Sequence, residues 1–127
     1  MSIKFKVIER GQPGVVGGGE KKYYAIPVMD GEFNLNDLTR SIEKICTVTG
    51  ADIRAVLYAL VDVAIEQLAR GTIVRLGDLG SLRASISAEG QATPEDVSAS
   101  TIKGASVIYT PGGRIKETLS IVKFEKE

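Results

Sequence analysis

The amino-acid sequence predicts an α+β fold in which a helical base precedes an antiparallel β-sheet. Residues 34–46 and 49–70 carry apolar side chains at helical spacing. Residues 72–76 are then typical of a short strand, and after the turn sequence Gly-Asp-Leu-Gly at 77–80, residues 81–87 alternate polar and apolar side chains. A run of helices followed by a run of strands is typical of an α+β domain.

The first 33 residues are predicted to add a pair of β-strands. Residues 3–8 place apolar and lysine side chains at alternate positions, which indicates a strand with one wet face. The glycine-rich residues 11–19 predict a loop, and residues 21–29 return to β-type composition. Pro27 lacks a backbone donor and places the second strand at a sheet edge or at its own end. We expect the two strands to pair as a hairpin that the rest of the domain or a second chain supports.

Capping residues mark where the two helices begin and end. Asn34 or Asn36 can cap the first helix. Thr49 and Asp52 have the spacing of a capping box for the second helix. Gly71 suits a left-handed cap at the end of that helix.

The second helix is predicted to form a homodimer. Its apolar side chains cover so much of its circumference that one partner helix cannot bury them all. We therefore expect a second chain against it. The predicted dimer interface combines helix residues with two residues from the following turn and strand: Val56, Leu57, Leu60, Val61, Ala64, Leu68, Leu79 and Leu82.

The second half of the chain is predicted to continue the sheet and to end in a short helix and a strand. Residues 88–104 are small and polar without a helical period, so they indicate an extended loop or β-arm. Pro111 suits the first turn of the short helix. Strands are predicted at 72–76, 81–87, 105–109 and 120–124. The arm is predicted at 88–104, and the short helix at 111–119.

Composition excludes several classes of function. The chain has no histidine and one cysteine, Cys46, so a zinc site, a Ser-His-Asp triad and a disulfide are not expected. Cys46 lies beside an apolar helix face and is predicted to be buried. No apolar run approaches the roughly 20 residues of a membrane span, and no signal-peptide pattern occurs. We expect a cytoplasmic protein that is not an enzyme and has no cofactor, small-molecule substrate or membrane partner.

The order of these elements, together with two stretches of sequence, resembles the bacterial histone-like HU and integration-host-factor family. Residues 55–83, AVLYALVDVAIEQLARGTIVRLGDLGSLR, are similar to its helix, short strand and Gly-containing turn. Residues 107–120, VIYTPGGRIKETLS, resemble its third strand and short C-terminal helix. The ends of the chain are similar to extended HU-like proteins of Bacteroides-type bacteria. The resemblance divides the chain into an N-terminal β extension, 1–33, and an HU-like domain, 34–127.

This resemblance implies an intertwined homodimer that binds double-stranded DNA in the nucleoid. In the family, basic arms meet phosphates with little sequence preference, and a proline near each arm tip wedges between base steps. Carried onto this sequence, Pro94 is the candidate wedge, and its alternative is a turn residue. The candidate phosphate contacts, whose alternative is ordinary solvated charge, are Arg75, Arg83, Lys103, Arg114 and Lys116.

Two departures from the family leave a second function open. Ser85 and Ser87 stand where the family has arginines, and Glu95 and Asp96 follow Pro94 at the arm tip. Lysine plus arginine and aspartate plus glutamate both number 16, so the formal net charge is zero. The alternative is therefore a structural or protein-interaction dimer that has lost DNA wrapping. A second basic strip on the N-terminal strands is a further hypothesis, with Lys4, Lys6, Lys21 and Lys22 as its members.

Overall fold

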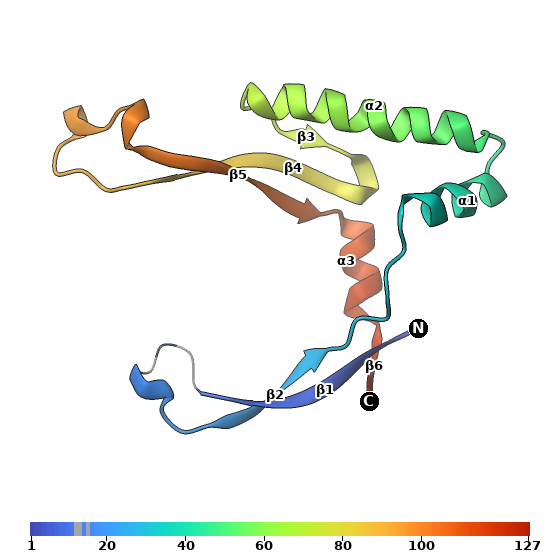
Figure 1. Ribbon diagram of the computed structural model, residues 1–127, viewed down its shortest axis with the longest axis horizontal. Coiled ribbons are helices and arrows are strands. Elements are labelled where there is room, and N and C mark those ends of the chain that lie inside the picture. Colours follow the sequence, from blue (N-terminus) through green and yellow to red (C-terminus); the bar gives the residue numbers. More distant parts are fainter. Residues whose placement is uncertain (12–13, 15) are drawn as a thin grey trace. The chain divides into compact units, whose positions relative to one another are not determined.

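The computed structural model describes the chain except residues 12, 13 and 15, and it divides into two compact units (Figure 1). One unit combines residues 1–33 with residues 118–127. The other comprises residues 34–117. The division into an N-terminal extension, 1–33, and an HU-like domain, 34–127, stays a prediction, and residues 118–127 lie in the same unit as residues 1–33.

The first unit is a three-stranded sheet in the order β2-β1-β6. β1 (Ser2–Arg10) pairs antiparallel with β2 (Lys22–Pro27), which confirms the predicted hairpin. β6 (Lys123–Lys126) pairs parallel with β1. The predicted loop at 11–19 includes the three residues outside the described part, and Val16–Gly18 in it form a 3-10 turn. β6 belongs to this sheet because it pairs with β1 from the other end of the chain. No local sequence pattern predicts this pairing.

The second unit begins with a helical hairpin. α1 (Leu35–Ile45) starts at Asn34, whose side chain accepts from the Asp37 amide at 3.0 Å while its own amide donates to Asp37 Oδ2 at 3.1 Å. α2 (Gly50–Ala69) is capped by Thr49, which accepts from the Asp52 amide at 3.4 Å. Gly71 follows with φ of 81°, the left-handed conformation predicted for it.

A three-stranded antiparallel sheet follows, in the order β3-β4-β5. Its strands are β3 (Val74–Arg75), β4 (Gly80–Ala88) and β5 (Ile102–Pro111). The predicted arm, residues 88–104, comprises the last residue of β4, the first three residues of β5 and the loop 89–101 between them, which contains two 3-10 turns, Pro94–Asp96 and Ala99–Thr101. α3 (Gly113–Ser120) begins two residues after the predicted start, because Pro111 still pairs with Gly80 at the end of β5.

The turn between β3 and β4 is held by contacts to the end of β5. Residues 77–79 form a 3-10 turn, and the Tyr109 hydroxyl donates to the Leu79 carbonyl oxygen at 2.6 Å. A Cβ at Gly80, where φ is 126°, would collide with the Thr110 carbonyl oxygen, and one at Gly112 would collide with that of Asp78. The glycines therefore allow the turn and β5 to approach closely.

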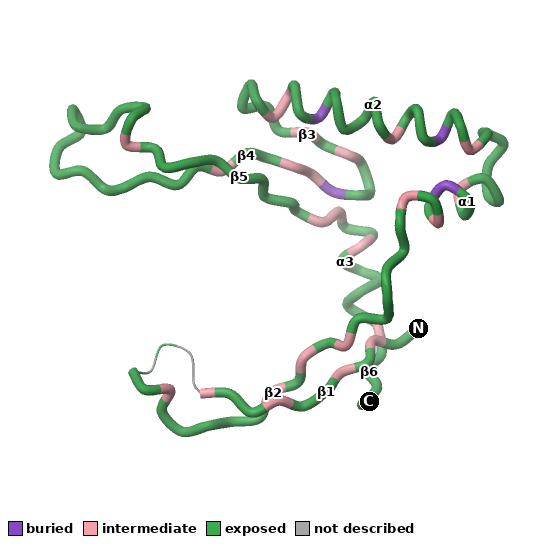
Figure 2. The backbone as a smooth tube through the Cα atoms, in the orientation of Figure 1, coloured by how far each residue is buried: buried purple, intermediate pink, exposed green. Residues whose placement is uncertain are grey.

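The described residues bury few of their apolar side chains (Figure 2). Among them, Ile53 and Ala64 are buried, at 6% and 8% exposure. The chain exposes 10461 Å², whereas two compact units of these sizes would together expose about 7,800 Å². Cys46 is exposed, so the prediction that it is buried is wrong: it is the C-cap of α1, one residue beyond the helix. The single chain therefore leaves much of its apolar surface open to solvent.

Candidate nucleic-acid interface

The sheet of the second unit has two chemically different faces. Directly paired residues in antiparallel strands share a face, and successive residues alternate between faces. One face is apolar and carries Val74, Leu82, Ala84, Ile86, Val107 and Tyr109. We call the other the polar face; it carries two arginines, five hydroxyl side chains and one isoleucine: Arg75, Arg83, Ser81, Ser85, Ser87, Ser106, Thr110 and Ile108.

Arg75 and Arg83 are the two candidate residues that the sheet brings together. Arg75 stands opposite Ser81, and Arg83 lies two positions further along β4 on the same face. Diagonal neighbours of this kind have Cα atoms roughly 7–8 Å apart. Both side chains are exposed, and the described residues place no carboxylate in an ion pair with either of them. Two guanidinium groups are therefore available on one side of the sheet.

A shallow hollow lies beside Arg75 at the inner end of the polar face. Its volume is about 260 Å³, and its lining includes Arg75, Ser81 and Thr110 as well as the glycines at 77, 80 and 112. Ser81 and Thr110 face each other across β4 and β5. Hydroxyl and guanidinium groups are the donors that proteins present to phosphate oxygens. The two hydroxyl residues were not among the predicted site residues, although the alternation that placed Arg83 outward also places Ser81 there.

Lys103 belongs to the arm and is already paired. It lies at the irregularity where the β4–β5 register shifts, and its Nζ is 3.3 Å from Glu89 Oε1. Both side chains are exposed, so the pair adds at most about 1 kcal/mol to stability. Residues 88–104 contain three carboxylates, Glu89, Glu95 and Asp96, against this one ammonium group, which gives a formal charge of −2. The arm is therefore a poor partner for phosphates.

Pro94 opens the first 3-10 turn of the arm loop. The Val97 amide donates to the Pro94 carbonyl oxygen at 3.2 Å, and the Asp96 amide donates to that of Thr93 at 3.2 Å. Residues 89–100 are all exposed. Pro94 thus occupies the turn position that was the alternative to a wedge, and insertion between base steps stays a prediction.

The last two candidate residues lie on α3, apart from the pair on the polar face. Arg114 Nη1 is 3.6 Å from Asp78 Oδ2, which joins the start of α3 to the turn between β3 and β4. Lys116 is exposed on the same helix. The structure therefore gives Arg114 an ion-pair partner within its own chain.

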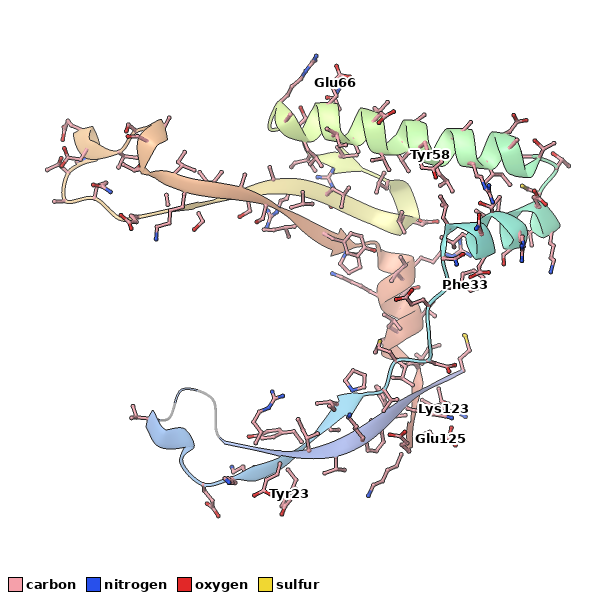
Figure 3. The ribbon with its side chains drawn as sticks, viewed as in Figure 1. Tyr23, Phe33, Tyr58, Glu66, Lys123 and Glu125 are labelled. Atoms are coloured by element: carbon pink, nitrogen blue, oxygen red, sulfur yellow. The ribbon has the colours of Figure 1, made fainter. Side chains whose placement is uncertain are left out.

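The residues predicted for the dimer interface are mostly uncovered in the single chain. Val56, Leu60, Val61 and Leu79 are 64%, 39%, 53% and 51% exposed. Leu57, Leu68 and Leu82 are half-buried, whereas Ala64 is buried within its own chain. Tyr58 also projects from α2 with 61% exposure, and it was not among the predicted interface residues (Figure 3).

The described part of the chain offers neither a metal site nor a membrane-spanning helix. It contains no group of three or more Cys, Asp or Glu side chains placed to hold a metal ion. No helix among the described residues is long and apolar enough to cross a membrane.

Comparison with protein families decides the identity of the fold. Residues 1–126 match the family HU-HIG, described as an HU domain fused to a wHTH, Ig or glycine-rich motif. The chain belongs to the HU-HIG family. This confirms the resemblance to HU proteins, and the match includes the N-terminal strands as well as the helical base.

A solved structure shares the fold of this HU-HIG chain. It is a candidate bacterial DNA-binding protein from Bacteroides vulgatus, with a TM-score of 0.66 and 17% sequence identity. The similarity covers 97% of this chain and 47% of that one, so this chain spans about half the length of the relative. A comparison with curated proteins finds no match.

Proposed function

We propose that this HU-HIG chain is a homodimeric DNA-binding protein that contacts the backbone of duplex DNA with little sequence preference. The observation that carries the proposal is the polar face, with Arg75 and Arg83 adjacent and exposed and no carboxylate on the same strands. Membership of an HU family and the fold shared with a candidate DNA-binding protein support it.

The open apolar surface supports the dimer. The exposed area exceeds that of two compact units by about 2,700 Å² per chain, or about 5,400 Å² for two chains, and obligate homodimers bury about 2,000–5,000 Å² or more in total. Uncovered apolar residues lie along α2, at Val56, Leu60 and Val61. A second copy of the chain would cover them as a closed, two-fold pair. Dimerisation would also double the arginines offered to one duplex.

The chemistry of the polar face suits phosphate more than base edges. Its side chains are two arginines and several short hydroxyl groups, which donate to phosphate oxygens and carry no sequence information by themselves. Such binding is driven by the release of counterions and weakens steeply with salt. The acidic arm limits the affinity, because its carboxylates repel the duplex.

A second function is favoured by the arm. Its formal charge is −2, and Lys103 is paired with Glu89. These features suit a structural or protein-interaction dimer that has kept the HU fold without wrapping DNA. In that case charge reversal at Arg83 and Lys103 leaves partner binding unchanged.

A fluorescence anisotropy titration separates the two functions. Three duplexes of unrelated sequence are titrated with the protein at 50 mM and 200 mM salt. Binding to all three with similar affinity, at least tenfold weaker at the higher salt, is the expected result, since about two or more phosphate contacts predict such a change. The absence of binding at 50 mM salt, where backbone contacts are strongest, overturns the DNA-binding function in favour of the interaction dimer.

A further inference from the structure

The N-terminal sheet separates its charged and apolar side chains onto opposite faces. The β2-β1-β6 register puts the even-numbered residues of β1 on one side together with their partners in β2 and β6. We call this side the basic face. It carries five cations and one carboxylate, a formal charge of +4, and its charged members are Lys4, Lys6, Arg10, Lys22, Lys123 and Glu125.

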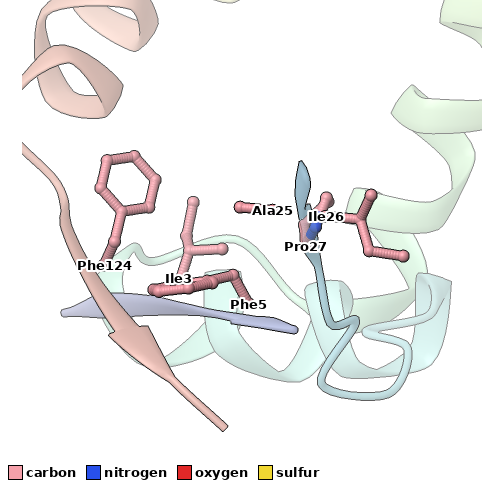
Figure 4. A pocket seen from close by; sticks show the side chains of 6 residues that line it. All are labelled: Ile3, Phe5, Ala25, Ile26, Pro27 and Phe124. Atoms are coloured by element: carbon pink, nitrogen blue, oxygen red, sulfur yellow. The ribbon is translucent and has the colours of Figure 1, made fainter. Parts of the chain in front are cut away.

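The opposite side of the same sheet is apolar. The lining of an open groove of about 560 Å³ includes Ile3, Phe5, Ala25, Pro27 and Phe124 (Figure 4). The charges on this side are Glu9 and Lys126, which sum to zero. The net charge of the whole chain is zero, so the overall composition does not reveal that one face of this short sheet has a formal charge of +4.

The cations of the basic face are open to a partner. All five side chains are exposed, and the described residues place no carboxylate within ion-pair distance of them. The one carboxylate, Glu125, stands opposite Lys4 in the register, but its Oε2 accepts from the Ser2 hydroxyl at 3.2 Å. Lys123 and Glu125 both project from β6 (Figure 3). The face therefore offers ammonium and guanidinium groups for binding.

The cations are also regularly spaced. Lys4 and Lys6 are two residues apart on one strand, a separation of about 6.6 Å, and Arg10 extends the row to about 20 Å. Duplex DNA carries one negative charge for about every 1.7 Å of its axis, so a row of cations of this length faces several phosphates. Lys22 opposite Arg10 and Lys123 beside Ser2 widen the row at both ends.

The side chains between the cations favour a nucleic-acid backbone over a membrane. Ile8, Tyr24 and Ile26 share the basic face but are only half exposed, so they present no large apolar surface for lipid. A duplex instead offers a long, uniform row of negative charge. Lys21, predicted for this strip, precedes β2 and does not belong to the face.

We propose that the basic face of the N-terminal sheet is a second surface that binds the phosphate backbone of duplex DNA. The inference rests on the proposed function, that this chain binds duplex DNA, and adds a separate site to the polar face of the other unit. It gives the N-terminal extension a role in binding.

Paired variants of the full chain test this surface. Lys4→Gln with Lys6→Gln removes two cations from the basic face, and Lys44→Gln with Lys126→Gln removes two exposed cations that lie outside it. Affinity for a duplex of 20 base pairs is measured between 50 and 200 mM salt for each protein. Every phosphate that a cation no longer neutralises reduces the slope of log affinity against log salt by about 0.9, so the first variant is expected to reduce it by about 1.8 per chain. The control variant is expected to keep the slope of the unaltered protein.

A third variant, Arg75→Gln with Arg83→Gln, separates this inference from the proposed function. An unaltered slope for the Lys4/Lys6 variant overturns the basic face as a DNA site and leaves the polar face standing. If the salt slope is lower for the Lys4/Lys6 variant but unchanged for the Arg75/Arg83 variant, the basic face is supported as a DNA site and the polar face is ruled out as one. If the unaltered protein binds poly-glutamate as tightly as it binds the duplex, the basic face is assigned to an acidic protein partner and the inference is overturned. Absence of duplex binding by the unaltered protein overturns both.

Discussion

Replacing Val61 with Asp is expected to break the proposed dimer. Val61 lies on α2 with 53% of its surface exposed in the single chain, among other uncovered apolar residues. Losing the burial of such a side chain costs about 2 kcal/mol. A two-fold interface contains the residue twice, so the dimer loses about 4 kcal/mol and its dissociation constant rises about a thousandfold. Sedimentation equilibrium across protein concentrations measures the change, and circular dichroism follows the folding of the chains that separate.

Asp62→Asn is the matched control for this change. Asp62 is exposed on the same helix and also changes its charge by one unit, but a charged residue is not expected inside the interface. The control is expected to keep the dissociation constant of the unaltered protein. A Val61→Asp variant that dimerises as tightly as the control would place the dimer interface elsewhere, and a monomeric unaltered protein at micromolar concentration would refute the dimer itself.

Reversing both arginines of the polar face is expected to abolish DNA binding at moderate salt. In a dimer, Arg75→Glu with Arg83→Glu removes four cations and adds four carboxylates to one surface. A charge-assisted hydrogen bond contributes about 1.5 kcal/mol or more, so even partial loss at four positions weakens binding more than a thousandfold. Anisotropy titration at 100 mM salt measures this loss.

Two control variants show whether charge or geometry is responsible. Arg75→Lys with Arg83→Lys preserves the charge and is expected to bind within about tenfold of the unaltered protein, because phosphate contacts are mainly electrostatic. Lys44→Glu with Lys126→Glu makes an equal change of net charge away from the polar face and is expected to have a small effect. If this second variant binds as weakly as the arginine reversal, total charge and not the polar face determines affinity.

Local signals in the sequence predicted much of the fold. Asn34 and Thr49 cap the two helices because short polar side chains next to an apolar period satisfy the first free amides. Gly71 adopts the left-handed conformation that its position after α2 requires. The period-two pattern of residues 3–8 correctly predicted β1, and the β-type composition of residues 21–29 correctly predicted its hairpin partner β2.

Features that depend on distant parts of the chain were not predictable in the same way. The parallel pairing of β6 with β1 joins residues more than a hundred positions apart, and no local pattern specifies it. The ion pair between Lys103 and Glu89 depends on how the arm folds back on itself. Cys46 was predicted to be buried from its neighbours in sequence, whereas the helix ends just before it.

The sequence named candidate residues for the site but did not predict which of them would be neighbours. The sequence supplied six candidate residues, and the strand register selects two of them, Arg75 and Arg83, as neighbours on one face. It also adds Ser81 and Thr110, which the sequence alone does not distinguish from other hydroxyl residues. Register depends on the pairing of β3, β4 and β5 and therefore emerges only with the folded sheet.

Two copies of this chain are proposed to bind one duplex through their sheets, and the mass of the complex tests this most directly. Light scattering coupled to size-exclusion chromatography, applied to the complex with a duplex of 20 base pairs at 50 mM salt, gives that mass. We predict two chains for each duplex, with the free protein also eluting as a dimer. A complex of one chain with one duplex, or a dimer that elutes separately from the DNA, would contradict the proposal.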